Sequence, residues 1–78
     1  AETSSLGYGT FIGARATVNP GAMIGHHVII HAHALIDVDA KIGEHVQIGA
    51  GSIINSGVVI EDGAFIGSGV TIVSGVTI

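Results

Sequence analysis

The sequence predicts an all-β fold, a parallel β-helix shaped as a triangular prism of about four 18-residue coils. Three observations predict it: a six-residue repeat running through all 78 residues, an unbroken aliphatic register within the repeat, and glycines restricted to two other registers. A period of six matches neither an amphipathic helix nor a long alternating strand, but it matches short strands with a corner after each one. We therefore expect residues 1–78 to form a single hexapeptide-repeat domain.

Each strand is expected to end on an aliphatic residue that points into the prism. Every sixth residue from Leu6 to Ile78 is Leu, Ile or Val, and none of these thirteen positions is polar. Two residues before each of them lies a small or β-branched residue, beginning with Ser4 and Thr10. Three strands make one coil, so residues 18 apart in the sequence should stack at the β spacing of about 4.8 Å.

The corner after each strand is expected where the glycines lie. All 13 glycines occupy the position directly after the aliphatic residue or the position two further on, where a tight turn favours glycine. His27, His33, His45 and Asp39 fill the later of these registers, and His and Asp are among the few other residues that tolerate positive φ. We therefore interpret these four primarily as turn residues, whereas Arg15 occupies the same register without an evident reason.

Composition limits the classes of function. The chain is 47% hydrophobic and 10% charged, with a net charge of −4 and no basic stripe, so neither a nucleic-acid nor a membrane partner is expected. No apolar run approaches a membrane span and the opening AETSS lacks signal-peptide features, so we expect a soluble, cytoplasmic protein. The absence of Cys excludes disulfides and thiol chemistry.

The outward-facing residues sort into three walls when the chain is stacked by 18. These walls are Phe11, Ile29, Gln47 and Phe65; then Thr17, Leu35, Ile53 and Thr71; then Ser5, Met23, Lys41, Val59 and Thr77. The first two walls are the more apolar, and the corner between them carries mostly small residues. An exposed apolar surface of this kind predicts contact with another chain, and the alternative is a monomer that tolerates scattered apolar residues.

Each repeat has an aliphatic residue, followed by one glycine position directly after it and another two residues later. Over nearly the whole chain this pattern resembles the hexapeptide repeat of trimeric acyltransferases. The resemblance implies left-handed coils, and hence a left-handed parallel β-helix. It also implies a homotrimer, here through the Phe11/Ile29/Phe65 wall and the Leu35/Ile53 wall. Acetyl-CoA is the cofactor that the resemblance suggests, and none is expected to be required for folding.

The resemblance also implies a chemistry. In acyltransferases of this family a corner histidine removes a proton from an acceptor hydroxyl or amine, which attacks the thioester of acyl-CoA or acyl carrier protein while backbone NH groups stabilise the oxyanion. His33 and then His31 are the candidate catalytic residues, because they lie beside the predicted interface where the family keeps its donor groove.

The nearest resemblance is to sialic-acid and bacillosamine acetyltransferases, through the segment NPGAMIGHHVIIHAHALIDVDAKIG at residues 19–43. Those enzymes carry a Glu, His, Asp triplet after an aliphatic position, and this chain has Asp37, Val38 and Asp39 there. Valine thus occupies the position of the catalytic base. In another registration, residues 30–49 resemble the opening coil of the UDP-acylglucosamine acyltransferases that begin lipid A synthesis, where this stretch is mainly structural.

The histidines do not predict a metal site. His27 and His45 are 18 residues apart and should stack at one corner with His26 beside them, whereas His31 and His33 belong to the next corner. Structural and catalytic zinc sites use three or four converging protein ligands, and the corner of His27 and His45 offers two or three. The γ-class carbonic anhydrases share this fold and bind zinc with three histidines at an interface, but the spacing here does not reproduce theirs.

Polar residues gather at a third corner, where Asp37 and Asp39 stack with Asn19 and Asn55. They are expected to form side-chain ladders and Asx-type turns, with a cation or acceptor contact as the alternative.

Two functions remain open. The first is the hexapeptide-repeat scaffold of an acyltransferase that transfers an acyl group from acyl-CoA to a hydroxyl or amine. The alternative is a minimal, truncated or engineered structural β-helix without catalytic activity, which the thirteen uninterrupted repeats, the absence of caps and Val38 favour. The sequence leaves the acceptor and the donor undetermined.

Overall fold

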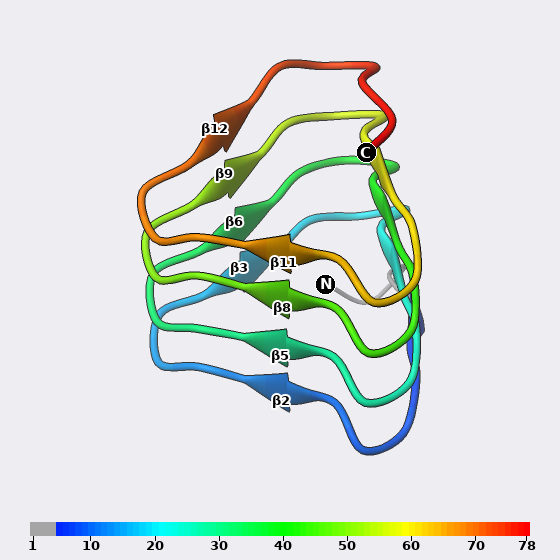
Figure 1. Cartoon of the computed structure of the whole chain (residues 1–78), viewed down its shortest axis with the longest axis vertical. Coiled ribbons are helices and arrows are strands. Elements are labelled where there is room, and N and C mark those ends of the chain that lie inside the picture. The colour runs from blue at the N-terminus through cyan, green and yellow to red at the C-terminus, as the bar shows by residue number, and fades with distance from the viewer. Residues whose placement is uncertain (1–4) are drawn as a thin grey trace.

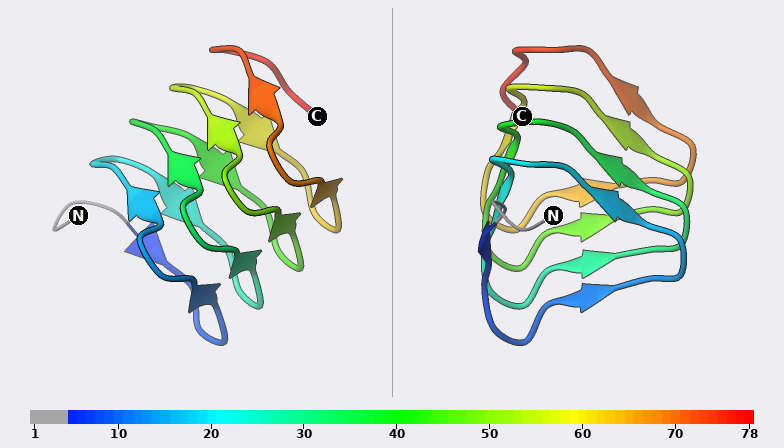
Figure 2. Two further views of the ribbon diagram at one scale, coloured as in Figure 1. Left: turned by 90° about the vertical axis from the view of Figure 1, so that its left-hand side faces the viewer. Right: turned by 180° about the vertical axis from the view of Figure 1, so that it is seen from behind.

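The computed structural model describes residues 5–78, which wind into a left-handed coil of about four turns (Figures 1 and 2). All regular structure in this range consists of two-residue β-strands joined by corners, and the strands lie in three parallel sheets. The expected left-handed parallel β-helix is therefore confirmed. Ser4, the first member of the small-residue register, lies outside the described residues.

Each sheet is one face of the prism. Sheet A contains β1 (Ser5–Leu6), β4 (Met23–Ile24), β7 (Lys41–Ile42) and β10 (Val59–Ile60). Sheet B contains β2 (Phe11–Ile12), β5 (Ile29–Ile30), β8 (Gln47–Ile48) and β11 (Phe65–Ile66). Sheet C contains β3 (Thr17–Val18), β6 (Leu35–Ile36), β9 (Ile53–Ile54) and β12 (Thr71–Ile72). The last repeat adds only an isolated parallel bridge between Thr77 and Val59.

The register of the sheets follows the 18-residue coil. Phe11 pairs with Ile29 and Ile30 pairs with Ile48, so every strand lies directly over its counterpart in the next coil. Three corners connect the sheets. The A–B corner comprises residues 7–10, 25–28, 43–46 and 61–64; the B–C corner, residues 13–16, 31–34, 49–52 and 67–70; and the C–A corner, residues 19–22, 37–40, 55–58 and 73–76.

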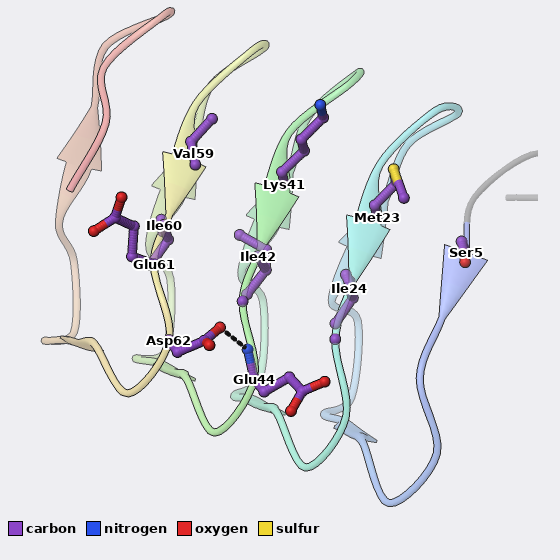
Figure 3. Close-up of a pocket in the computed structure, with 12 residues that line it drawn as sticks. Ser5, Met23, Ile24, Lys41, Ile42, Glu44, Val59, Ile60, Glu61 and Asp62 are labelled. Atoms are coloured by element: carbon purple, nitrogen blue, oxygen red, sulfur yellow. Dashed lines mark hydrogen bonds between the residues drawn. The ribbon is translucent and has the colours of Figure 1, made fainter.

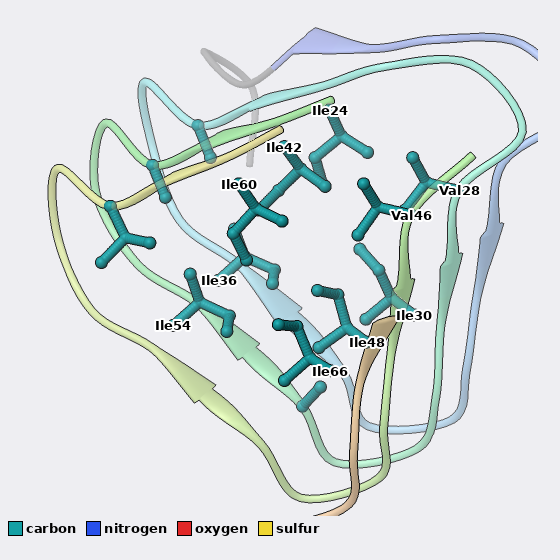
Figure 4. Close-up of a cluster of buried hydrophobic side chains, with 14 of the residues drawn as sticks. Ile24, Val28, Ile30, Ile36, Ile42, Val46, Ile48, Ile54, Ile60 and Ile66 are labelled. Atoms are coloured by element: carbon teal, nitrogen blue, oxygen red, sulfur yellow. The ribbon is translucent and has the colours of Figure 1, made fainter. Parts of the chain in front are cut away.

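The aliphatic register fills the interior, as predicted (Figure 4). Its members from Ile24 to Ile72 are buried, and burial of one such side chain contributes about 1.5–3 kcal/mol. The small register also points inward, because Ala22 and Val28 are fully buried. Leu6 and Ile78 are 53% and 46% exposed, since each lies at an end of the described stack.

Two polar side chains, those of Thr10 and Ser52, lie in the small-residue register two positions before the aliphatic residues, and both form hydrogen bonds there. The Ser52 hydroxyl is fully buried, donates to the Gly67 carbonyl at 2.7 Å and accepts from the Val70 N–H at 3.2 Å. Thr10 makes the equivalent pair, donating to the Gly25 carbonyl at 2.8 Å and accepting from the Val28 N–H at 3.3 Å. A hydroxyl is tolerated at these positions because it satisfies corner backbone groups of the next coil.

The positive φ predicted for His27, His33, His45 and Asp39 is confirmed, and Arg15 in the same register shares it. The φ angles of Arg15, His27, His33, Asp39 and His45 lie between 58° and 64°. In this conformation the backbone N–H points along the solenoid axis, and the His33 N–H donates to the Ala14 carbonyl of the preceding coil at 3.0 Å. His27 and His45 donate in the same way at 3.0 and 3.1 Å. The left-handed conformation thus joins adjacent coils at the corner.

Candidate functional site

The two predicted catalytic residues lie together on the B–C corner. His31 follows β5 directly and His33 occupies the positive-φ position two residues later, and both are exposed. The His31 Nε2 atom lies 3.3 Å from the Gln47 Oε1 atom, which projects from β8 in the next coil. A carboxamide oxygen only accepts hydrogen bonds, so this contact is a hydrogen bond in the tautomer that carries its proton on Nε2.

The B–C corner brings successive coils close together. A Cβ atom built on Gly49 would lie 2.5 Å from the Gly67 carbonyl carbon and from the Ser68 nitrogen, so only glycine fits there. The walls on either side carry exposed apolar side chains: Phe11 and Phe65 on sheet B are 61% and 71% exposed, and Ile53 on sheet C is 37% exposed. The B–C corner thus lies between two faces that carry exposed apolar side chains.

The A–B corner carries the other three histidines. His27 and His45 stack with ring centroids 5.1 Å apart and planes inclined by 18°, as their 18-residue separation predicts. His26 stacks on Tyr8 at 4.0 Å, and its Nδ1 atom accepts a hydrogen bond from the Tyr8 N–H at 3.0 Å. Within residues 5–78, no group of three or more His, Cys, Asp or Glu side chains is arranged to hold a metal ion.

The C–A corner carries a polar ladder. Asn19 Nδ2 donates to Asp37 Oδ1 at 3.0 Å, and the Val38 N–H donates to the same oxygen at 2.7 Å. The hydrogen bond from Asn19, and to a smaller extent that from the Val38 N–H, lowers the pKa of the Asp37 carboxyl because it stabilises the charged form. Asn55 Nδ2 extends the ladder by donating to the Ile72 carbonyl at 2.8 Å. The side-chain ladder expected from the sequence is therefore present, whereas Asp37 bonds the backbone of the next residue and not that two residues on, as an Asx turn requires.

Val38 is 41% exposed at this corner and has no acid–base group. The position that the sequence resemblance assigned to a catalytic base is therefore an outward-facing apolar side chain.

Sheet A carries a groove that sequence reasoning did not identify (Figure 3). It is an open hollow of about 760 Å³ lined on one side by Met23, Lys41 and Val59 from the strands. On the other side it reaches Glu44 and Asp62 of the A–B corner, where the Glu44 N–H donates to Asp62 Oδ1 at 2.8 Å. The only available signal was the wall of residues 18 apart, which includes Lys41 between Met23 and Val59.

Among residues 5–78 no helix has the length and apolar character needed to cross a membrane.

The fold and its corners define the class of protein as a hexapeptide-repeat β-helix. A profile of the bacterial transferase hexapeptide family (six repeats) matches residues 3–37 and 39–78, leaving out only Val38 between the two segments. The chain therefore belongs to the bacterial transferase hexapeptide family. A search of curated proteins found no match.

Solved structures share the fold. The acetyltransferase domain of PglB from Neisseria gonorrhoeae FA1090 matches 95% of this chain with a TM-score of 0.58 and 22% identity. The same domain in complex with acetyl coenzyme A matches 91% with a TM-score of 0.56 and 24% identity. In both cases the match covers 48% of the other chain, so this chain spans about half the length of those proteins.

Proposed function

We propose that this chain is the solenoid of an acyltransferase that moves an acyl group from acyl-CoA, with acetyl-CoA as the first candidate, to a hydroxyl or an amine. The observation that carries the proposal is the family match over residues 3–37 and 39–78. The similarity to a PglB acetyltransferase domain that was solved with acetyl coenzyme A supports the choice of donor.

The proposed active unit is a homotrimer. The described strands and corners repeat without an inserted loop, so a donor and an acceptor need a second surface to exclude water and orient them. A neighbouring copy packed against the apolar walls of sheets B and C would provide that surface. Phe65 on sheet B and Ile53 on sheet C are the exposed apolar side chains that this packing would cover.

The proposed base is a histidine of the B–C corner. His31, held through Nε2 by Gln47, presents Nδ1 to take the proton of the acceptor as its oxygen or nitrogen attacks the thioester carbonyl. The new C–O or C–N bond forms, the C–S bond breaks, and the proton passes from the imidazole to the coenzyme A thiolate. His33 is the second candidate, because it lies on the same corner.

Calorimetric titration of acetyl-CoA into the purified chain tests donor binding. Acyl transfer is then followed as free coenzyme A with a thiol reagent, using a panel of amines and amino sugars, and the absence of Cys in the chain removes the protein background. His31→Asn should lower the rate by about 10²-fold or more, the usual contribution of a general base. His45→Asn, a corner substitution on the A–B side, is the matched control and should leave the rate unchanged.

Light scattering tests the trimer independently. The wild-type mass should be three times the 7.8 kDa of one chain. Phe65→Glu should give monomers, whereas Met23→Glu on sheet A should remain trimeric. A monomeric wild type at micromolar concentration would contradict the assembly.

A purely structural β-helix is the second candidate function, and the observation that favours it is Val38 at the position of the expected base. A trimer that shows no acetyl-CoA binding at millimolar concentration would establish this alternative over the enzyme.

A further inference from the structure

The stacked rings of His27 and His45 are the only imidazole pair in the described chain with a face-to-face arrangement. We propose that these two side chains form a binding site for a divalent transition cation such as Ni²⁺ or Zn²⁺, with water completing the coordination. The site lies on the A–B corner, away from the histidines of the proposed acyl-transfer site on the B–C corner.

The separation of the rings fits two ligands of one ion. A metal–nitrogen distance of about 2.1 Å places each ring centroid about 3.2 Å from the metal, so two tetrahedral ligands have centroids about 5.2 Å apart. The centroids of His27 and His45 are 5.1 Å apart. The 18° angle between the planes makes their lone pairs nearly parallel, so binding requires each ring to turn about its Cβ–Cγ bond.

The rings can turn while the backbone beneath them stays fixed. Both side chains are exposed, and no hydrogen bond holds either ring in the described part of the chain. The His27 ring also makes an edge contact with Tyr8, with centroids 5.5 Å apart, so turning it requires that contact to shift. The backbone is held by the hydrogen bonds from the His27 N–H to the Tyr8 carbonyl and from the His45 N–H to the His26 carbonyl. Fixed attachment points raise the effective concentration of the second imidazole once the first has bound the metal.

The charge of the corner favours a cation. Glu44 directly precedes His45, and Glu61 and Asp62 occupy the same corner one coil further on, whereas its segments contain neither Lys nor Arg. A divalent cation therefore reduces the local negative charge when it binds.

His26 is not part of the site in this arrangement. Its Nδ1 atom is engaged by the Tyr8 N–H, and its ring centroid lies 6.5 Å from that of His27 with the planes inclined by 65°. The site therefore has two protein ligands, consistent with the absence of any larger ligand group among residues 5–78.

Calorimetric titration of NiCl₂ into the full chain, purified without a histidine tag, tests the proposal. We expect one ion bound per chain, and His27→Asn and His45→Asn should each weaken binding by at least about tenfold because each leaves a single imidazole. Asparagine is chosen because it tolerates the positive φ at these positions. His33→Asn removes a histidine from the same register on another corner and should leave the affinity unchanged.

Circular dichroism of each variant verifies that the β-helix has formed before the titration. No binding by the wild type, or equal loss in all three variants, would overturn the proposal. A stoichiometry of one ion per three chains would also overturn it, because the ion would then lie between copies rather than on one corner. Failure of acyl transfer has no bearing on this result, since the two sites use different histidines.

Discussion

Two glycines of the B–C corner should respond very differently to the same substitution. Gly51 has a φ of +70° and open space where a Cβ would lie, so Gly51→Ala adds backbone strain without a steric clash. The left-handed conformation costs about 1–2 kcal/mol for an L-residue, and the lower entropy of the unfolded Ala chain offsets about 0.4–1 kcal/mol of that. The expected net loss is therefore about 1 kcal/mol.

Gly49→Ala places its Cβ 2.5 Å from backbone atoms of Gly67 and Ser68, which cannot move without shifting the next coil. Overpacking of this kind costs about 1–3 kcal/mol, and the upper end applies because backbone rather than a flexible side chain must move. Gly49→Ala should therefore lower the free energy of unfolding by roughly 1–2 kcal/mol more than Gly51→Ala.

Urea denaturation at one fixed protein concentration measures both variants, because the stability of an oligomer depends on concentration. Gly51→Asn serves as the control, since asparagine tolerates positive φ and should recover most of the stability lost in Gly51→Ala. If Gly51→Ala were as destabilising as Gly49→Ala, close coil packing would not be the reason for glycine at position 49.

Three further predictions concern stability. Ser52→Ala removes the hydroxyl that pairs with the Gly67 carbonyl and the Val70 N–H in part-buried hydrogen bonds, and it should cost about 1–2 kcal/mol in urea denaturation. Ser56→Ala, which loses only a 3.4 Å hydroxyl contact, should be nearly neutral. The pKa of Asp37 is lower in the folded state than in the unfolded state. Its carboxylate therefore adds to the free energy of unfolding above the unfolded-state pKa of about 3.9, and this stabilisation is lost as the pH falls through the folded-state pKa. The stability difference between wild type and Asp37→Asn should accordingly shrink on acidification in this range, and a difference that grew would contradict the assigned cause. Arg15 has a φ of 61°, and Arg15→Gly should raise the urea midpoint because glycine adopts this conformation without strain. A lowered midpoint would refute this reasoning.

Much of the candidate site followed from the period. The 18-residue coil placed His27 over His45 and Asn19 over Asp37, and both contacts are present in the structure. The positive φ of the corner histidines was also predictable, because they replace glycine in a register that otherwise requires it. The roles of His31 and His33 in acyl transfer remain predictions.

Other contacts depend on side-chain direction and could not be predicted. Gln47 was assigned to an apolar wall, yet its amide reaches sideways to His31 at the corner, across 16 rather than 18 residues. His26 accepts a hydrogen bond from the Tyr8 backbone N–H. The 18-residue stacking places the two residues side by side, but it does not show whether they meet through a hydrogen bond or through their rings. Rotamers decide both interactions, and a period contains no information on rotamers.

The sequence by itself predicted the architecture, because a six-residue period with an aliphatic register fits short strands with a corner after each and buries its apolar residues when three strands form a coil. The left-handedness came from the resemblance to the hexapeptide repeat. The sequence also determined which residues share a column, since stacking by 18 follows directly from that coil. Only the tertiary structure decided which neighbouring groups those columns touch, including the groove on sheet A and the tight contact at Gly49. These features depend on distances between the side chains and backbone of adjacent coils, which are set by packing in three dimensions.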